Sequence, residues 1–155
     1  MKKRFLSLLL VLVLIMSLMP AALAVNADDA QPKTISVTFR LHTDTDEWIA
    51  PTEVSDLPEG TSVFTVFQKV LADKGYTYEY HEQYCYVQAI TAPDGTRLAE
   101  FSKGQNSGWL FRVNNDFADV GMNDFVLMDG DEIEVLYTAD YAKEPGMSLP
   151  YTDVS

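Results

Sequence analysis

The sequence contains one cysteine, Cys85, whose thiol is the nucleophile that a cysteine hydrolase would use, and two histidines, His42 and His81. A cysteine hydrolase needs a histidine that activates the thiol, and neither histidine lies in a recognisable catalytic motif. Cys85 lies among alternating apolar residues, which favours a buried small hydrophobe over a reactive thiol. The sequence contains no glycine-rich phosphate loop, histidine metal cluster or nucleophile elbow. We therefore expect no catalytic residues and no enzymatic activity and, with a single cysteine, no intramolecular disulfide.

A second set of residues that could do chemistry is an acidic turn at residues 43–47. Its carboxylates belong to Asp44, Asp46 and Glu47, and carboxylate oxygens are the ligands that calcium takes. The spacing lacks the glycine and the distal glutamate of the twelve-residue calcium loop. A solvated loop is therefore the favoured interpretation, with calcium as the alternative. We expect no metal site and no cofactor.

The first 24 residues have the pattern of a removable export signal. A basic start, Lys2 to Arg4, precedes an apolar run from Phe5 to Met19, and Ala22-Leu23-Ala24 offers the small residues that a signal peptidase needs. The apolar run is short for a membrane span of about 20 residues, so a retained membrane anchor is the less favoured alternative. We expect cleavage after Ala24 and a secreted, extracellular protein with no membrane span after cleavage.

The formal net charge of the chain is −12 at pH 7, and cleavage would also remove the basic residues Lys2 to Arg4. Such acidity argues against nucleic acid and anionic membranes as partners. After the signal we expect a flexible lead-in at residues 25–33, one domain at residues 34–138 and an irregular tail at residues 139–155. The tail contains Pro145 and Pro150, and its hydrophobic periodicity is lost.

Hydrophobic periodicity predicts the first elements of this domain. Residues 34–42 alternate apolar and polar side chains, as a half-buried strand does, and His42 falls on the polar, solvated face. Residues 48–54 form a shorter strand, and Pro51 within it indicates the edge of a sheet. A helix with an apolar stripe follows a cap at residues 61–62 and ends at Gly75.

The second half of the domain reads as further strands. A tyrosine-rich segment places Tyr84 and Tyr86 on one strand face, opposite Cys85. Such a face suits a binding platform and equally an exposed strand with high β propensity. A short strand is predicted at residues 97–101. The stretch from Ser107 to Tyr137 then predicts two strands, at residues 109–113 and 132–137, with turns at Asn114-Asn115 and Asp129-Gly130-Asp131.

Four segments of this stretch resemble a family of bacterial secreted domains named for their likeness to the C-terminal domain of transcobalamin and intrinsic factor. They are Gly108-Trp109, Val113-Asn114, residues 120–125 and residues 129–133. Phe125 departs mildly from the family pattern, which often has tyrosine there. The resemblance implies an α+β fold, a small β-grasp-like mixed sheet packed on one helix.

The resemblance also implies a ligand-facing segment. In the vertebrate cobalamin carriers the similar domain closes over one side of the corrinoid, and an α-helical barrel supplies the other side. We expect no such barrel within these residues and therefore no full enclosure of cobalamin. The segment that starts at Trp109 and includes the loop from Asn114 to Val120 falls where the carriers face their ligand. Gly121, just after it, is expected to hold a backbone conformation that other residues avoid.

The leading hypothesis is a secreted, non-catalytic binding module for a small molecule, with a cobalamin-like corrinoid as the first candidate. The alternative is an extracellular protein-interaction module that uses the tyrosine-rich strand. For the loop itself, a ligand rim and a hairpin connection with Phe117 folded onto the core both stay open, and Trp109 fits the core better than a site. The candidate ligand-binding residues are Trp109, Phe111, Asn114, Asn115, Phe117, Tyr84 and Tyr86.

Overall fold

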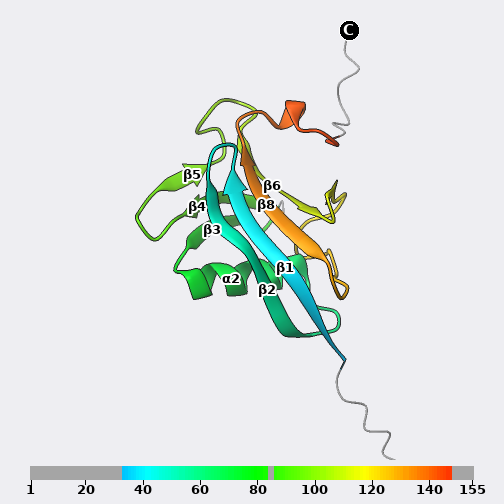
Figure 1. Ribbon diagram of the computed structural model, residues 1–155. Coiled ribbons are helices and arrows are strands. Elements are labelled where there is room, and N and C mark those ends of the chain that lie inside the picture. Colours follow the sequence, from blue (N-terminus) through cyan, green and yellow to red (C-terminus); the bar gives the residue numbers. More distant parts are fainter. Residues whose placement is uncertain (1–32, 84–85, 148–155) are drawn as a thin grey trace, which may run out of the picture. The chain divides into compact units, whose positions relative to one another are not determined.

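The structure is a computed structural model that describes residues 33–83 and 86–147 (Figure 1). The predicted signal at residues 1–24, most of the lead-in, Tyr84, Cys85 and residues 148–155 lie outside the described residues. The elements are strands β1 (Thr34–Thr43), β2 (Glu47–Pro58), β3 (Thr77–His81), β4 (Tyr86–Thr91), β5 (Arg97–Ala99), β6 (Gly108–Val113), β7 (Asp116–Phe117) and β8 (Glu132–Thr138), helix α2 (Val63–Lys74) and a short 3-10 helix, η1 (Tyr141–Lys143).

Five strands form one mixed sheet in the order β2-β1-β8-β6-β7. The neighbours β1 and β8 run parallel, and the other pairs run antiparallel. The alternation predicted for residues 34–42 is confirmed, because Val37, Phe39 and Leu41 are buried while the residues between them are half-buried. The predicted edge position of the strand that contains Pro51 is also confirmed, since β2 has a neighbour on one side only.

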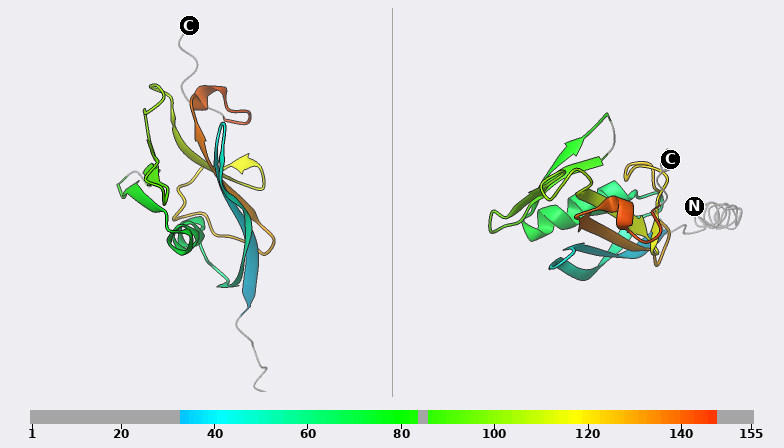
Figure 2. Two further views of the ribbon diagram at one scale, coloured as in Figure 1. Left: turned by 60° about the vertical axis from the view of Figure 1, so that its left-hand side comes forward. Right: turned by 90° about the horizontal axis from the view of Figure 1, so that it is seen from above.

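Helix α2 begins and ends at the predicted caps. The Ser62 hydroxyl accepts a hydrogen bond from the Thr65 N–H at 3.3 Å, which satisfies one of the free donors of the first turn. Gly75 ends the helix in the left-handed conformation, with φ of 78°. Phe67 on its buried face contacts Phe39 of β1, with 6.4 Å between the ring centroids, and Tyr78 of β3 at 5.1 Å. The helix therefore lies between the five-stranded sheet and a second sheet (Figure 2).

The second sheet consists of β3, β4 and β5 in that order. Tyr80 of β3 packs inward, with its ring centroid 4.4 Å from that of Phe64, and the hydroxyl of Tyr76, just before β3, donates to the Trp48 carbonyl at 2.7 Å. The α+β class is confirmed for the described residues, but the sequence predicted one sheet on one helix and the structure has two. The pattern of alternation cannot tell strands of one sheet from strands of two.

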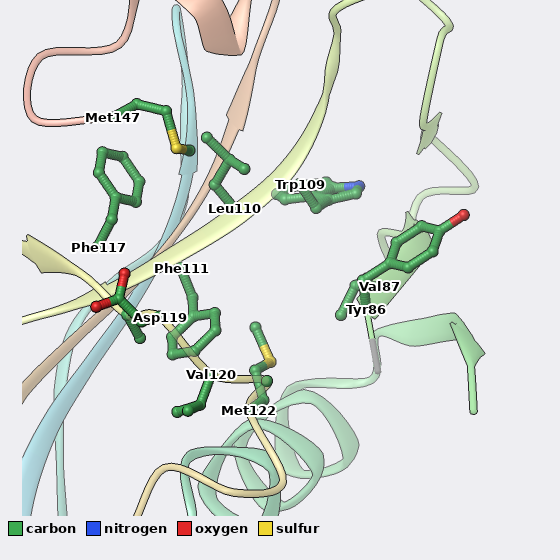
Figure 3. A pocket seen from close by; sticks show the side chains of 12 residues that line it. Tyr86, Val87, Trp109, Leu110, Phe111, Phe117, Asp119, Val120, Met122 and Met147 are labelled. Carbon is green, nitrogen blue, oxygen red and sulfur yellow. The ribbon is translucent and has the colours of Figure 1, made fainter. Parts of the chain in front are cut away.

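The first residues of the predicted tail lie against the domain. The Ala139 N–H donates to the Asp44 carboxylate at 3.1 Å, and the Tyr141 N–H donates to the Asn106 carbonyl at 2.9 Å. One carboxylate of the acidic turn therefore holds the start of the tail. The chain then continues to Met147, which lies near Phe117 of β7 (Figure 3). Among the described residues, no helix is long and apolar enough to span a membrane.

Candidate ligand-binding site

A hollow of about 350 Å³ lies beside β6, and we call it the apolar hollow (Figure 3). Strand β6 supplies Trp109, Leu110 and Phe111, and the chain after β7 supplies most of the opposite wall. Apart from the Asp119 carboxylate and the Tyr86 hydroxyl, the side chains in its wall are apolar. The described residues that line it are Tyr86, Val87, Trp109, Leu110, Phe111, Phe117, Ala118, Asp119, Val120, Gly121, Met122 and Met147.

Trp109 belongs both to the core and to the wall of the apolar hollow. Its indole N–H donates to the Leu98 carbonyl at 2.9 Å, and its ring lies 5.2 Å from that of Tyr137 and 5.5 Å from that of Trp48. Only 7% of the residue is exposed. The sequence interpretation of Trp109 as a core residue is confirmed. Its fixed ring gives the apolar hollow a rigid aromatic surface.

The two phenylalanines of the predicted site, Phe111 and Phe117, also line the apolar hollow. Phe111 is half-buried and meets Phe125 edge-to-face at 6.4 Å. Phe117 is half-buried, and the Arg112 guanidinium lies 5.6 Å from its ring centroid, in reach of a cation–π contact. The Phe117 ring is therefore held in place while one side still faces the hollow. Phe117 therefore lines the hollow and belongs to the β6–β7 hairpin, and its role in a ligand rim stays a prediction.

Asn114 and Asn115 lie elsewhere. They form the two-residue turn between β6 and β7, with φ of 53° and 73°, the left-handed values that a type I′ turn needs and asparagine tolerates. The Asn114 side chain accepts from the Glu132 N–H at 3.0 Å and donates to the Asp131 carboxylate at 2.8 Å. These bonds tie the turn to the start of β8. Neither asparagine lines the apolar hollow.

Tyr86 is the described member of the predicted tyrosine pair, and Tyr84 lies outside the described residues. The Tyr86 ring lines the apolar hollow and stacks on His81, with 5.7 Å between ring centroids and 3° between planes. Gly121 lines the hollow too, but its predicted role is wrong because it does not have a positive φ. Its carbonyl instead accepts from the N–H groups of Asp124 and Phe125 at 3.0 and 3.2 Å, which closes a turn.

The hollow also includes residues that were not named as candidates. Leu110, Asp119 and Val120 lie within the segment that the resemblance placed at the ligand, whereas Met122 and Met147 lie outside it. Met122 had a usable signal, because it lies in residues 120–125, one of the segments that carry the family resemblance. Met147 had none. Its position depends on hydrogen bonds between the tail and distant turns, and no local pattern reports such bonds.

The outer face of the five-stranded sheet carries a cluster of charges that we call the charged face. It consists of Arg40 and His42 from β1, Arg112 from β6 and Glu134 from β8. The Glu134 carboxylate lies 2.7 Å from His42 Nε2 and 3.5 Å from an Arg40 nitrogen, and it also accepts from Arg112. Burial acts to raise the pKa of Glu134, but hydrogen bonds from Arg112 and His42 and their charges outweigh it and hold this pKa below its usual value.

The charged face corrects the sequence interpretation of His42 as solvated. Only 19% of its side chain is exposed, and its Nδ1 lies 3.0 Å from the Thr43 carbonyl oxygen. Beside this cluster lies a second hollow of about 630 Å³, whose lining includes Arg40, Arg112, Asn114 and Asn115. The predicted site residues are therefore divided: Trp109, Phe111, Phe117 and Tyr86 meet at the apolar hollow, and the two asparagines lie at this second hollow.

These features define a small α+β protein with an apolar hollow at the edge of a sheet. The chain belongs to the family described as domain of unknown function (DUF4430), whose profile matches residues 60–139. The family membership predicted from the sequence is confirmed, and the match includes the whole of the stretch from Ser107 to Tyr137. The search of the curated proteins found no match.

Two solved structures are similar to the chain. One is haptocorrin in complex with Cbi, with 19% identity, a TM-score of 0.49 and coverage of 68% of this chain and 25% of that chain. The other is an inferred metal binding protein from Ruminococcus gnavus ATCC 29149, with 22% identity, a TM-score of 0.43 and coverage of 68% of this chain and 95% of that chain. The chain thus matches about a quarter of the haptocorrin chain.

Proposed function

We propose that the chain is a secreted, non-catalytic binding module that takes a small apolar molecule in the apolar hollow. The observation that carries this proposal is the composition of the hollow. Rigid aromatic rings of Trp109 and Phe111 and the flexible thioethers of Met122 and Met147 line one concave site. Binding sites for small molecules are typically concave and apolar with a few polar groups that fix orientation, and Asp119 and Tyr86 would supply those groups.

The size of the hollow limits the ligand. Its volume of about 350 Å³ lies near the lower end of the range of roughly 300–1,000 Å³ that is usual for small-molecule sites. A small ligand would fill it, whereas a large flat ligand would contact it with one face or one side arm. A corrinoid, the first candidate from the sequence resemblance, would bind in this second way and would need another component to cover its far side.

The charges support a non-catalytic role. Acid–base catalysis uses paired titratable groups in a dry pocket, and among the described residues Asp119 is the only carboxylate in the wall of the apolar hollow. Glu134, a carboxylate whose pKa is lowered, is paired with basic side chains on the charged face and lies outside the apolar hollow. Within residues 33–83 and 86–147, no group of three or more His, Cys, Asp or Glu side chains is placed to hold a metal ion.

The finer fold assignment belongs to the same proposal. A β-grasp-like arrangement is supported by the first and last strands, β1 and β8, which pair in parallel at the centre of the five-stranded sheet. Helix α2 crosses the inner face of this sheet. The alternative function, a protein interface on the tyrosine-rich strand, has less support. Tyr78 and Tyr80 pack on α2, and Tyr86 stacks on His81.

The proposal is tested by titration of the purified chain with cobinamide, cobalamin and Nile red, a neutral apolar dye. We expect saturable Nile red binding with a blue-shifted emission and quenching of tryptophan fluorescence. Met147→Ala should weaken binding about tenfold, because the loss of one buried side-chain contact costs roughly 1.4 kcal/mol. Met128→Ala is the matched control, since Met128 is 74% exposed and lies outside the hollow.

The outcomes distinguish the corrinoid candidate from the more general proposal of an apolar binding site. If neither corrinoid binds at tens of micromolar while Nile red does, the corrinoid candidate fails and the apolar site stands. If no probe binds, or if Met147→Ala and Met128→Ala behave alike, the apolar hollow is not a binding site.

A further inference from the structure

Strand β6 has one fully paired edge and one partly paired edge. Along β8 it is paired from Gly108 to Val113, but on its other side β7 pairs only with Arg112 and Val113. The turn at residues 114–115 closes this short hairpin. In a two-residue hairpin, the residues that flank the turn exchange backbone hydrogen bonds. The N–H and C=O of Val113 therefore point toward β7.

Backbone groups along a strand point alternately to its two sides. Trp109 and Phe111 therefore direct their N–H and C=O groups to the same side as Val113, and Leu110 directs its groups to β8. The Asn114 N–H agrees with this alternation, because it donates to the Glu132 carbonyl of β8 at 2.9 Å. Within the described part of the chain, no backbone group pairs with Trp109 or Phe111 on the open side.

Two hollows lie along this open edge. One is the apolar hollow. The other is a third hollow, distinct from the one beside the charged face, with a volume of about 350 Å³. It shares Tyr86, Val87, Trp109 and Leu110 with the apolar hollow and extends to Phe101 and Glu100. Side chains of neighbouring strand residues point to opposite faces of a sheet. Trp109 and Leu110 are neighbours in sequence, and each of them lines the two hollows. The hollows therefore lie at the edge of the strand and not over one face of the sheet.

We propose that the open edge of β6 binds an extended, cationic peptide segment by strand addition. The N–H and C=O groups of Trp109 and Phe111 would pair with the peptide backbone, which would lie along the two hollows together with the apolar side chains of the peptide. Asp119 borders one hollow and Glu100 the other, and the chain carries a net charge of −12. Lysine or arginine in the peptide matches this charge.

This inference goes beyond the proposed small-molecule function, because backbone groups of the strand supply the recognition. It makes a prediction that an apolar site alone does not make. A bound peptide would slow amide exchange at Trp109 and Phe111, whose N–H groups face the open edge. It would leave exchange at Leu110 and Arg112 unchanged, because their N–H groups already pair with β8.

The test uses amide exchange measured by NMR on the purified full chain with the blocked hexapeptide acetyl-(Val-Lys)₃-amide. We expect at least tenfold slower exchange at Trp109 and Phe111 and no change at Leu110 and Arg112. The peptide with glutamate in place of lysine should bind at least tenfold more weakly, and N-methylation of alternate residues should abolish binding. Equal binding of the N-methylated peptide, or binding without protection of Trp109 and Phe111, would overturn strand addition.

A matched pair of variants isolates one backbone N–H. Phe111→Ala removes the ring and keeps the N–H, whereas Phe111→Pro removes both. Proline is tolerated at an edge where the N–H faces outward, so neither variant loses a hydrogen bond within the sheet. Peptide affinity should fall about fivefold further in Phe111→Pro, the equivalent of about one hydrogen bond, while Nile red affinity should fall equally in both. Equal peptide affinity of the two variants would contradict the proposal, and the N-methylated peptide tests it without any substitution.

The chain's own C-terminus is the competing occupant, because residues 148–155 follow directly on Met147 in the wall of the apolar hollow. Their sequence contains Asp153 and no basic residue, which does not match the acidic rim. Truncation after Met147 should therefore leave the peptide affinity unchanged. If truncation instead raised the affinity and sped amide exchange at Trp109 and Phe111, the edge would be occupied by this segment, and the proposal of an external peptide would fail.

Discussion

The apolar hollow and the charged face share strand β6 but differ in how far their groups are satisfied within the protein. On the charged face, Glu134 is surrounded by three basic side chains, and His42 is bonded at both ring nitrogens. In the apolar hollow, half-buried rings and the backbone edge of Trp109 and Phe111 still face open space. Groups that already have partners gain little from a ligand, whereas exposed apolar surface gains from burial.

This difference shows why size alone does not identify the site. The hollow beside the charged face measures about 630 Å³ and the apolar hollow about 350 Å³. The larger one is lined by charges that pair with each other and by Asn114, which holds the β6–β7 turn. A ligand there would compete with internal ion pairs, and a ligand in the apolar hollow would not. Arg112 connects the two regions, because it pairs with Glu134 and also contacts the Phe117 ring.

The largest expected effect concerns the aromatic wall. Trp109→Ala should lower the free energy of unfolding by about 3–5 kcal/mol, as large-to-small changes at buried aromatic residues do, and should also abolish Nile red binding. Chemical denaturation followed by far-ultraviolet circular dichroism would measure the stability. Leu110→Ala is the control on the same strand and should cost less than half as much, because Leu110 is only half-buried. If the Trp109→Ala variant were as stable as the wild type, Trp109 would not be both a core residue and part of the binding surface.

The next effect tests the charged face. Glu134→Gln should lower the free energy of unfolding by about 1–3 kcal/mol at pH 7, because it leaves basic side chains without their shared carboxylate. Glu132→Gln is the matched control, since Glu132 is exposed on the same strand. Nile red affinity should change in neither variant. Loss of dye binding in Glu134→Gln would show that the charged face and the apolar hollow are energetically coupled.

The same variant gives a pH dependence with a defined sign. The pKa of Glu134 lies below its usual value in the folded protein, so folding favours the ionised carboxylate. The resulting stability is present at pH values above the usual glutamate pKa of about 4.3 and is lost as the pH falls through the lower, folded value. Denaturation curves between pH 6 and pH 3 should therefore converge for the wild type and Glu134→Gln. A constant difference would mean that the pairing of Glu134 does not depend on its charge.

Local patterns predicted the framework of both regions. The strand at residues 34–42 and the helix between Ser62 and Gly75 were predicted to within about a residue, because alternation and caps are local signals. The turn at Asn114-Asn115 was also predicted. The side of the sheet that this turn faces was not predicted, because it depends on how the strands pair. That pairing placed the asparagines away from the apolar hollow.

The missed features all depend on contacts between distant parts of the chain. His42 and Glu134 are 92 residues apart in sequence, and each looks like an ordinary polar residue of a half-exposed strand. Met147 reaches the apolar hollow only because Asp44 and Asn106 hold the start of the tail. The second sheet likewise depends on which strands pair. Periodicity reports the face on which a residue lies, but it does not report what lies opposite that face.

A smaller effect tests the division between the two asparagines and the apolar hollow. Asn114→Ala should lower the free energy of unfolding by about 1–2 kcal/mol, because alanine is strained at a φ of 53° and the bonds to Asp131 and Glu132 are lost. Asn114→Gly removes the same bonds without the strain, so it should cost less. Nile red affinity should be unchanged in both variants. If dye binding weakened while the stability stayed unchanged, Asn114 would be a ligand-binding residue, as the sequence predicted.

The smallest effect belongs to Asn115, the second residue of the same turn, with φ of 73°. Asn115→Gly should change the free energy of unfolding by less than about 0.5 kcal/mol. Glycine relieves the left-handed strain, but it also gives the unfolded chain more conformational freedom, and these effects oppose each other. Thermal denaturation and a Nile red titration on one sample would measure both properties. Because the stability is expected to stay nearly unchanged, any loss of dye affinity must come from the loss of the Asn115 side-chain amide. Such a loss would show that a ligand in the apolar hollow extends around the β6–β7 turn to the charged face, and the two regions would then form one site.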